Sequence, residues 1–134
     1  MFTHQTQLRV RYAETDQMGY VYYGNYAQYF ETGRVEALRS LGYTYRNMEE
    51  NGVMMPVVHM KTDFIKPALY DDLITIKTII STLPTVRMYF TYEIINEAGV
   101  LLAVGETTLF FVNRATQRPM RCPDFLYTKL QALL

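Results

Sequence analysis

The chain has 134 residues, 49% of them hydrophobic, and its 13 basic side chains balance its 13 acidic ones. This length and composition predict one packed domain over residues 1–134 and argue against disorder. A neutral chain lacks the strongly basic face that nucleic acids usually require, so no nucleic-acid partner is expected.

Cys122 is the only cysteine, which excludes an intramolecular disulfide and a cysteine-rich zinc site. Residues 1–7 lack the apolar run of a signal peptide and no stretch is long enough to span a bilayer, so we expect a cytoplasmic protein without integral membrane contact.

The first elements are predicted from an alternation of polar and apolar residues and from its loss. Leu8, Val10 and Tyr12 alternate with polar residues, which is typical of a short strand over residues 7–12. Residues 13–24 lose this periodicity and contain two glycines, so they are predicted to form a loop. The residues before the strand are expected to be irregular, with His4 in solvent.

A long helix is predicted after this loop. Its stripe of residues at helical spacing is Tyr26, Phe30, Gly33, Ala37 and Leu41. Asn25 stands just before the stripe and can cap the helix, and Gly42 follows its last turn as a C-terminal stop. Gly33 is a poor helix former, so its place in the stripe indicates that the helix approaches a sheet closely.

Four further strands are predicted after a connecting segment over residues 47–55. They are Val57–Ile65, Leu73–Thr82, Thr85–Ile95 and Val100–Asn113. Residues 96–99 form a hairpin turn between the last two, and residues 123–134 are predicted to form a short amphipathic helix. Consecutive strands with short connections are expected to pair antiparallel, so the sequence predicts an α+β fold in which a five-stranded antiparallel sheet wraps one long central helix. Such a unit leaves sheet edges uncovered, and we therefore expect a homodimer or a homotetramer.

Residues 12–26 carry the most informative motif. Its elements in order are Asp16, Gly19, the pair Val21-Tyr22 and the pair Asn25-Tyr26. This pattern resembles the signature of the 4-hydroxybenzoyl-CoA thioesterase family, and Arg34 and residues 70–73 match as well. It is also similar to the bacterial Tol-Pal-associated acyl-CoA thioesterases, many of which carry His where this chain has Tyr23. The resemblance implies the hotdog fold and the hydrolysis of acyl-CoA, or of an acyl group on acyl carrier protein, without a cofactor.

Within this resemblance, Asp16 is the expected catalytic carboxylate. It can act as a nucleophile or as a general base, and the sequence leaves both roles open. The amides of Tyr23 and Gly24, at the start of the helix, are the implied oxyanion hole, because N–H groups there lack helical partners. The alternative for Asp16 is a loop aspartate that accepts hydrogen bonds from nearby backbone amides.

Four further residues are candidates for substrate contact. The resemblance implies such contacts for Asn25, Tyr26 and Glu31, and it places Arg87 near a basic run that holds CoA phosphates. Glu31 is also the second candidate for the catalyst, and its alternative is an ion pair with Arg34 on one helix face. Other basic candidates for the phosphates are Lys61, Lys66, Arg114, Arg118 and Arg121. No metal site is expected, because the two histidines lie far apart without further ligands at metal-site spacing.

Two other classes of function compete with the hydrolase. Dehydratases or hydratases on such a fold use a histidine with an acid, and neither histidine of this chain lies in the motif or the helix. A non-catalytic module that binds acyl-CoA or acyl carrier protein is the other class, and the presence of Asp16 beside the helix start argues against it. The sequence does not define the acyl group.

Overall fold

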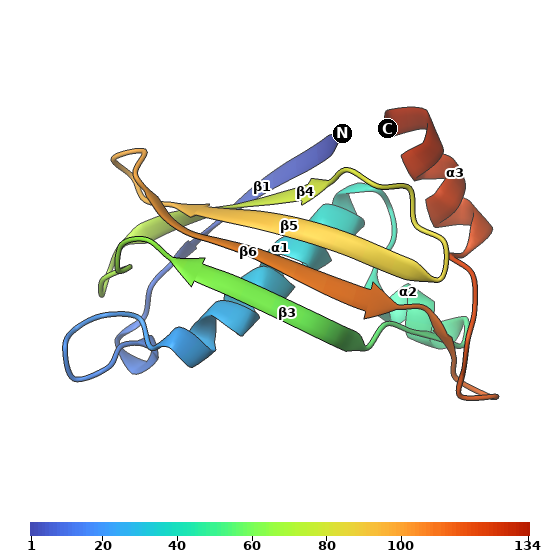
Figure 1. The fold of residues 1–134 in the computed structure, drawn as a ribbon, viewed down its shortest axis with the longest axis horizontal. Coiled ribbons are helices and arrows are strands. Elements are labelled where there is room, and N and C mark those ends of the chain that lie inside the picture. Colours follow the sequence, from blue (N-terminus) through green and yellow to red (C-terminus); the bar gives the residue numbers. More distant parts are fainter.

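The computed structural model describes residues 1–134, and its main feature is a five-stranded antiparallel sheet that lies across one long helix (Figure 1). The helix is α1, Tyr26–Ser40, and the strand order is β1-β4-β5-β6-β3. The strands are β1 Phe2–Arg9, β3 Val57–Phe64, β4 Leu73–Ile80, β5 Arg87–Ile95 and β6 Leu101–Phe110. The predicted α+β class and the five-stranded sheet around a central helix are confirmed.

Helix α1 packs against β1, β4 and β5, and two glycines allow it to approach the sheet closely. A Cβ atom on Gly33 would lie 2.6 Å from Oγ1 of Thr78 and 2.7 Å from Cγ2 of Ile76, both on β4. A Cβ atom on Gly105 of β6 would collide with the ring of Phe30. The close approach of the helix that Gly33 predicts is therefore present. Gly42 follows the helix with φ at +82°, a conformation that glycine adopts without strain.

Strand β1 begins earlier than the sequence indicates. It pairs with β4 over its whole length, from Phe2 opposite Ile80 to Arg9 opposite Leu73. The prediction of an irregular N-terminus was wrong. Exposed and partly buried side chains do alternate along β1, but some of the partly buried ones are polar, so the sequence shows no alternation of polar and apolar residues there. His4 is one of them, and its side chain is partly buried opposite Thr78.

The segment before β3 also differs from the prediction of a simple connection. It contains the short helix α2, Tyr45–Glu50, which begins at a cap where Oγ1 of Thr44 accepts a hydrogen bond from the amide of Asn47. The two-residue strand β2, Val53–Met54, follows and pairs with β7, Val112–Asn113, which in turn pairs with β8, Arg118–Pro119. The predicted C-terminal helix is present as α3, Asp124–Leu133.

Strand β3 pairs with β6 and not with its neighbour in sequence, β4, so the expectation that consecutive strands pair fails here. As a result β3 is an edge strand of the sheet (Figure 1). None of its side chains is buried. None of the helices is long and apolar enough to cross a membrane.

Candidate active site

Asp16 lies in a tight loop between two short 3-10 turns, η1 (Tyr12–Glu14) and η2 (Tyr23–Asn25). Its backbone amide donates to the carbonyl of Tyr20 at 2.7 Å, and its Oδ1 accepts from the amides of Met18 at 2.9 Å and Tyr20 at 3.2 Å. Gly19 closes the loop with φ at +79°. One carboxylate oxygen of Asp16 therefore accepts hydrogen bonds from nearby backbone amides, as in the alternative interpretation of this residue as a loop aspartate. The other oxygen, Oδ2, accepts no hydrogen bond from the chain, so the carboxylate keeps one atom available for chemistry.

A mostly apolar pocket of about 320 Å³ opens beside this carboxylate. The η2 turn and the start of α1 contribute Tyr23 and Tyr26, and the end of β3 contributes Phe64 with Lys66 just beyond it. Asp16 is the only carboxylate among the lining residues. Burial raises the pKa of Tyr26, so its hydroxyl stays protonated near neutral pH. Asp16 is thus the one lining group suited to act as a base there.

A second hollow, of about 470 Å³, lies on another side of Asp16. Tyr12 and Tyr70 form one of its walls, with their rings edge to face at a centroid distance of 5.8 Å. Both tyrosines are more than half exposed. A thioester whose carbonyl reached Asp16 would therefore have space on two sides of the carboxylate, one for each end of the molecule.

The start of the helix lies at the same pocket, because Tyr23 lines it together with Asp16. The η2 turn leads directly into α1, and the amides of Tyr23 and Gly24 are at the positions that have no acceptor within a helix. There is little space for a side chain at Gly24, because a Cβ atom there would lie 2.8 Å from the ring of Tyr22. The prediction that the Asn25 side chain caps the helix was wrong: its Nδ2 donates instead to the carbonyl of Glu14 at 2.8 Å.

The structure brings some predicted site residues together and separates others. Asp16, Tyr23 and Tyr26 line one pocket. Glu31 is exposed, further along α1, and lines none of the larger pockets. It makes no ion pair with Arg34, whose Nε donates instead to the hydroxyl of Tyr45 at 3.1 Å.

Arg87 lies far from Asp16 within one chain. It opens β5, where its guanidinium stands over the ring of Phe110 at 5.2 Å. Ile94, near the other end of β5, is in register with Ala103 and through it with Phe64 of the pocket. At a rise of roughly 3.3 Å per residue, Arg87 is on the order of 20 Å from that end of the sheet.

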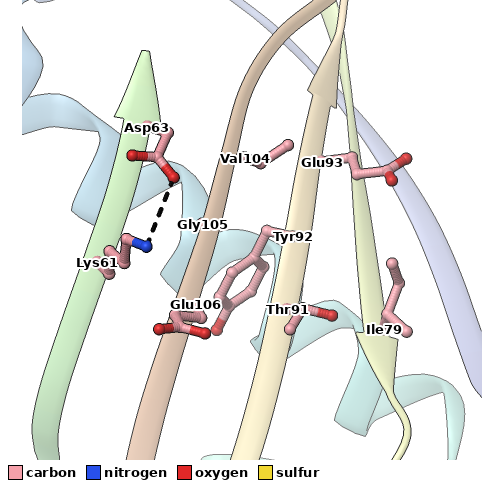
Figure 2. Close-up of a pocket in the computed structure, with 9 residues that line it drawn as sticks. All are labelled: Lys61, Asp63, Ile79, Thr91, Tyr92, Glu93, Val104, Gly105 and Glu106. Atoms are coloured by element: carbon pink, nitrogen blue, oxygen red, sulfur yellow. Dashed lines mark ion pairs between the residues drawn. The ribbon is translucent and has the colours of Figure 1, made fainter. Parts of the chain in front are cut away.

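The outer face of the sheet carries a separate hollow of about 230 Å³ that includes another phosphate candidate, Lys61 (Figure 2). Its Nζ pairs with Asp63 at 3.9 Å, and Glu93 and Glu106 line the same hollow. Three carboxylates and a single lysine line this hollow, so its charge repels a phosphate and this face is a poor site for CoA. None of the predicted catalytic residues lies here.

Sequence reasoning missed two residues of the Asp16 pocket and one residue of the loop that carries Asp16. Phe64 and Ile65 form part of the pocket wall although they are far away in the sequence, and only the fold brings them there. Glu14 was overlooked for another reason: it stands within the motif, two residues before Asp16, but only its buried contacts distinguish it from an ordinary surface glutamate.

Comparisons with known proteins identify the family of the chain as a whole. A family model described as the Thioesterase-like superfamily matches residues 10–130. YneP of Bacillus subtilis, whose name marks it as a candidate acyl-CoA thioesterase, is 34% identical over 121 residues that cover 90% of this chain and 88% of YneP. The acyl-CoA thioester hydrolase YbgC of Escherichia coli is 29% identical over 124 residues, 92% of each protein. Among solved structures, the DHNA-CoA thioesterase from Staphylococcus aureus superposes with a TM-score of 0.92 at 37% identity, covering 99% of this chain and 93% of that one.

The chain belongs to the Thioesterase-like superfamily. Its helix and antiparallel sheet are those of the hotdog thioesterases, so the resemblance found in residues 12–26 is confirmed. The expectation of a thioester hydrolase is confirmed with it.

Proposed function

We propose that the chain hydrolyses acyl-CoA thioesters, with Asp16 as the catalytic carboxylate and the amides of Tyr23 and Gly24 as the oxyanion hole. The observation that supports this most is a carboxylate with one unbonded oxygen in an apolar pocket, next to the start of a helix. An apolar pocket suits an acyl chain, and a nearby helix start suits the negative charge that develops on its carbonyl oxygen.

Two routes fit this arrangement. In the first, Oδ2 of Asp16 attacks the thioester carbon, CoA leaves as its thiolate, and water then cleaves the mixed anhydride to release the acid. In the second, Asp16 takes a proton from a water molecule that attacks the same carbon, and the thiolate leaves with the acid as the other product. Both routes place negative charge on the carbonyl oxygen, where one preorganised amide is worth about 2.7–4 kcal/mol in other enzymes.

Lys66 is the phosphate partner that the structure favours among the candidates. It is exposed and lines the same pocket as Asp16, and it forms none of the ion pairs of the structure. A CoA pantetheine arm leaving the pocket past Lys66 would bring phosphate oxygens within reach of its ammonium group. Acyl carrier protein thioesters remain the alternative substrate, because their pantetheine arm is the same. A non-catalytic binding module is less favoured, since no binding role requires the free oxygen of Asp16.

The open edge of the sheet supports the expected homodimer. Apolar side chains from Val57 to Ile65 are 43–53% exposed along β3, and unpaired edge strands of this kind readily pair with another chain. Because the end of β3 also forms the wall of the Asp16 pocket, pairing at this edge would place the pocket at the subunit interface. A partner chain would then complete the acyl site. The tetramer and the cytoplasmic location stay predictions.

The function is tested by mixing the purified protein with butyryl-, palmitoyl-, benzoyl- and DHNA-CoA, and separately with acyl carrier protein thioesters, in the presence of a thiol reagent that detects the released thiol. The expected result is release of CoA from at least one of these thioesters at a rate that scales with protein concentration. Cleavage of acyl carrier protein thioesters alone would select the alternative substrate. Binding of acyl-CoA without release of CoA from any thioester would overturn the proposed hydrolase.

A further inference from the structure

Glu14 is a buried acid that the proposed mechanism does not use. It is 8% exposed, although glutamate is rarely buried unless its charge is paired. Its Oε1 accepts from the backbone amide of Arg11 at 2.9 Å and from the hydroxyl of Tyr29 at 3.0 Å. Its Oε2 accepts from the guanidinium of Arg11 at 3.3 and 3.4 Å. The carboxylate is therefore fully engaged inside the base of the Asp16 loop.

The contact with Tyr29 links this loop to helix α1. Tyr29 lies one turn into α1 and is 2% exposed, so its ring is fixed by the core. Burial and the adjacent Glu14 charge raise the pKa of Tyr29, so the hydroxyl stays protonated and donates to the carboxylate. One end of the bond is thus held by the rigid helix, and the other belongs to the loop.

The backbone of Glu14 fixes the far end of the same loop. Its carbonyl accepts from the amide of Tyr22 at 2.9 Å and from Nδ2 of Asn25 at 2.8 Å. These two residues flank Tyr23 and Gly24, whose amides form the proposed oxyanion hole. A bridge between Thr15 and Val21 continues the same closure toward Asp16. Glu14 therefore contacts the helix, the segment before Asp16 and the turn that presents the amides.

We propose that Glu14 is a positioning residue that sets the distance between the Asp16 carboxylate and the amides of Tyr23 and Gly24, anchored to the helix by the Tyr29 hydroxyl. This inference rests on the proposed role of Asp16. Glu14 does not line the Asp16 pocket, so it acts through the loop and not on the substrate. Misplacing a catalytic group by about 1 Å can cost a hundredfold in rate, which gives such an anchor a large effect.

The inference is tested with variants that remove different contacts of the Glu14 side chain. Glu14→Ala removes every side-chain contact, and Tyr29→Phe removes only the hydroxyl while keeping the core ring. Glu14→Gln keeps an oxygen that can accept from both the Arg11 amide and Tyr29, and the exposed Arg11 side chain can turn away from the new amide group. The control is Glu36→Gln on helix α1. Glu36 also pairs with an arginine, Arg39, but it lies outside the loop.

The measurement is kcat and KM for one acyl-CoA, with unfolding followed by circular dichroism for each variant. We expect kcat to fall about ten- to a hundredfold in Glu14→Ala and about tenfold in Tyr29→Phe, with KM changed less than about threefold. Glu14→Gln and Glu36→Gln should stay within about threefold of the wild-type kcat, since neither removes the anchor. A folded Tyr29→Phe variant with wild-type kcat would overturn the inference, even if Glu14→Ala fails to fold.

Combining these changes with Asp16→Asn separates positioning from general loss of structure. If Glu14 acts through Asp16, Tyr29→Phe should lower the residual rate of Asp16→Asn by less than about threefold, because groups that act as a unit are not additive. The same tenfold loss in both backgrounds would show a merely structural role and overturn the inference. An Asp16→Asn enzyme with nearly full activity would instead refute the proposed catalytic role of Asp16, so the two failures are distinguishable.

Discussion

Strands β4 and β3 belong to one sheet but have very different surroundings. Along β4 every second side chain is buried, and Ile74, Ile76, Thr78 and Ile80 are all 0% exposed. Along β3 no side chain is buried, and its large apolar residues are close to half exposed. The difference follows from the positions of the two strands: α1 packs mainly against β1, β4 and β5, and β3 lies at an edge of the sheet.

The two sides therefore contribute different properties. The β4 side supplies the close contacts that hold the domain together, such as the one between Gly33 and Thr78. The β3 side supplies walls for the pocket at Asp16 and an edge that another chain can join. Changes on the β4 side should mainly affect stability, whereas changes on the β3 side should mainly affect assembly and substrate use.

The largest expected effect on stability comes from the packed side. Phe30 is 0% exposed and stacks on Tyr92 with 4.5 Å between ring centroids. Phe30→Ala should lower the free energy of unfolding by about 3–5 kcal/mol, because it leaves a cavity beneath the helix. The control Phe125→Ala, at a half-exposed position on α3, should cost about 1 kcal/mol or less. Urea unfolding of both variants checks this, and similar losses in the two would contradict the division of roles.

The next effect concerns the open edge. We expect a wild-type dimer by light scattering at micromolar concentration. Met60→Lys on β3 should raise the dissociation constant of this dimer by at least about tenfold, since a charge would be buried at the interface. Thr91→Lys is the control, because Thr91 is exposed on β5, which β6 separates from the β3 edge. An active wild-type monomer at that concentration would refute pairing through β3.

A third prediction concerns the exposed acid on the helix flank. If Glu31 contacts the acyl group in the assembled enzyme, Glu31→Gln should change the ranking of butyryl-, palmitoyl- and benzoyl-CoA by roughly tenfold in kcat/KM, the low end of what one pocket contact discriminates. Some activity should remain with each substrate. Equal losses with all three would instead indicate that Glu31 acts in catalysis or folding.

The smallest expected effect is a loss of stability at alkaline pH. Burial, and next the charge of Asp124, raise the pKa of the Cys122 thiol from its ordinary value of 9.0 to about 12. The folded state then keeps the proton that the unfolded state loses, so this contribution is complete below pH 9 and is lost as pH rises toward 12. Between pH 9 and 10, wild type should lose up to about 1.4 kcal/mol more stability than Cys122→Ala. Equal pH dependence of unfolding in the two proteins would contradict this.

The sequence predicted most of the fold where a periodic pattern was strong. Helix α1 and strands β4 and β5 were predicted because their buried residues recur without interruption. The start of β1 was missed because polar side chains such as His4 occupy its partly buried face. The pairing of β3 with β6 was also missed, because which edge a strand joins depends on contacts far apart in the sequence.

The candidate site divides in the same way. Asp16 and Tyr23 were found because they lie within one local motif, and the structure places both at one pocket. Phe64 carries no local signal of this role and reaches the pocket only because β3 ends there. Glu14 needed the fold as well, since its partner Tyr29 lies on the helix and the bond between them joins two elements.

The rate of Asp16→Asn tests the central claim most directly. This substitution keeps the size and the Oδ1 acceptor of the loop but removes the charge that a nucleophile or a general base requires. It should lower kcat at least about a hundredfold with little effect on folding, whereas the control Asp63→Asn, on the outer face of the sheet, should leave kcat unchanged. Retention of more than about a tenth of the wild-type rate by Asp16→Asn would contradict the account and make Glu31 the leading candidate for the catalyst.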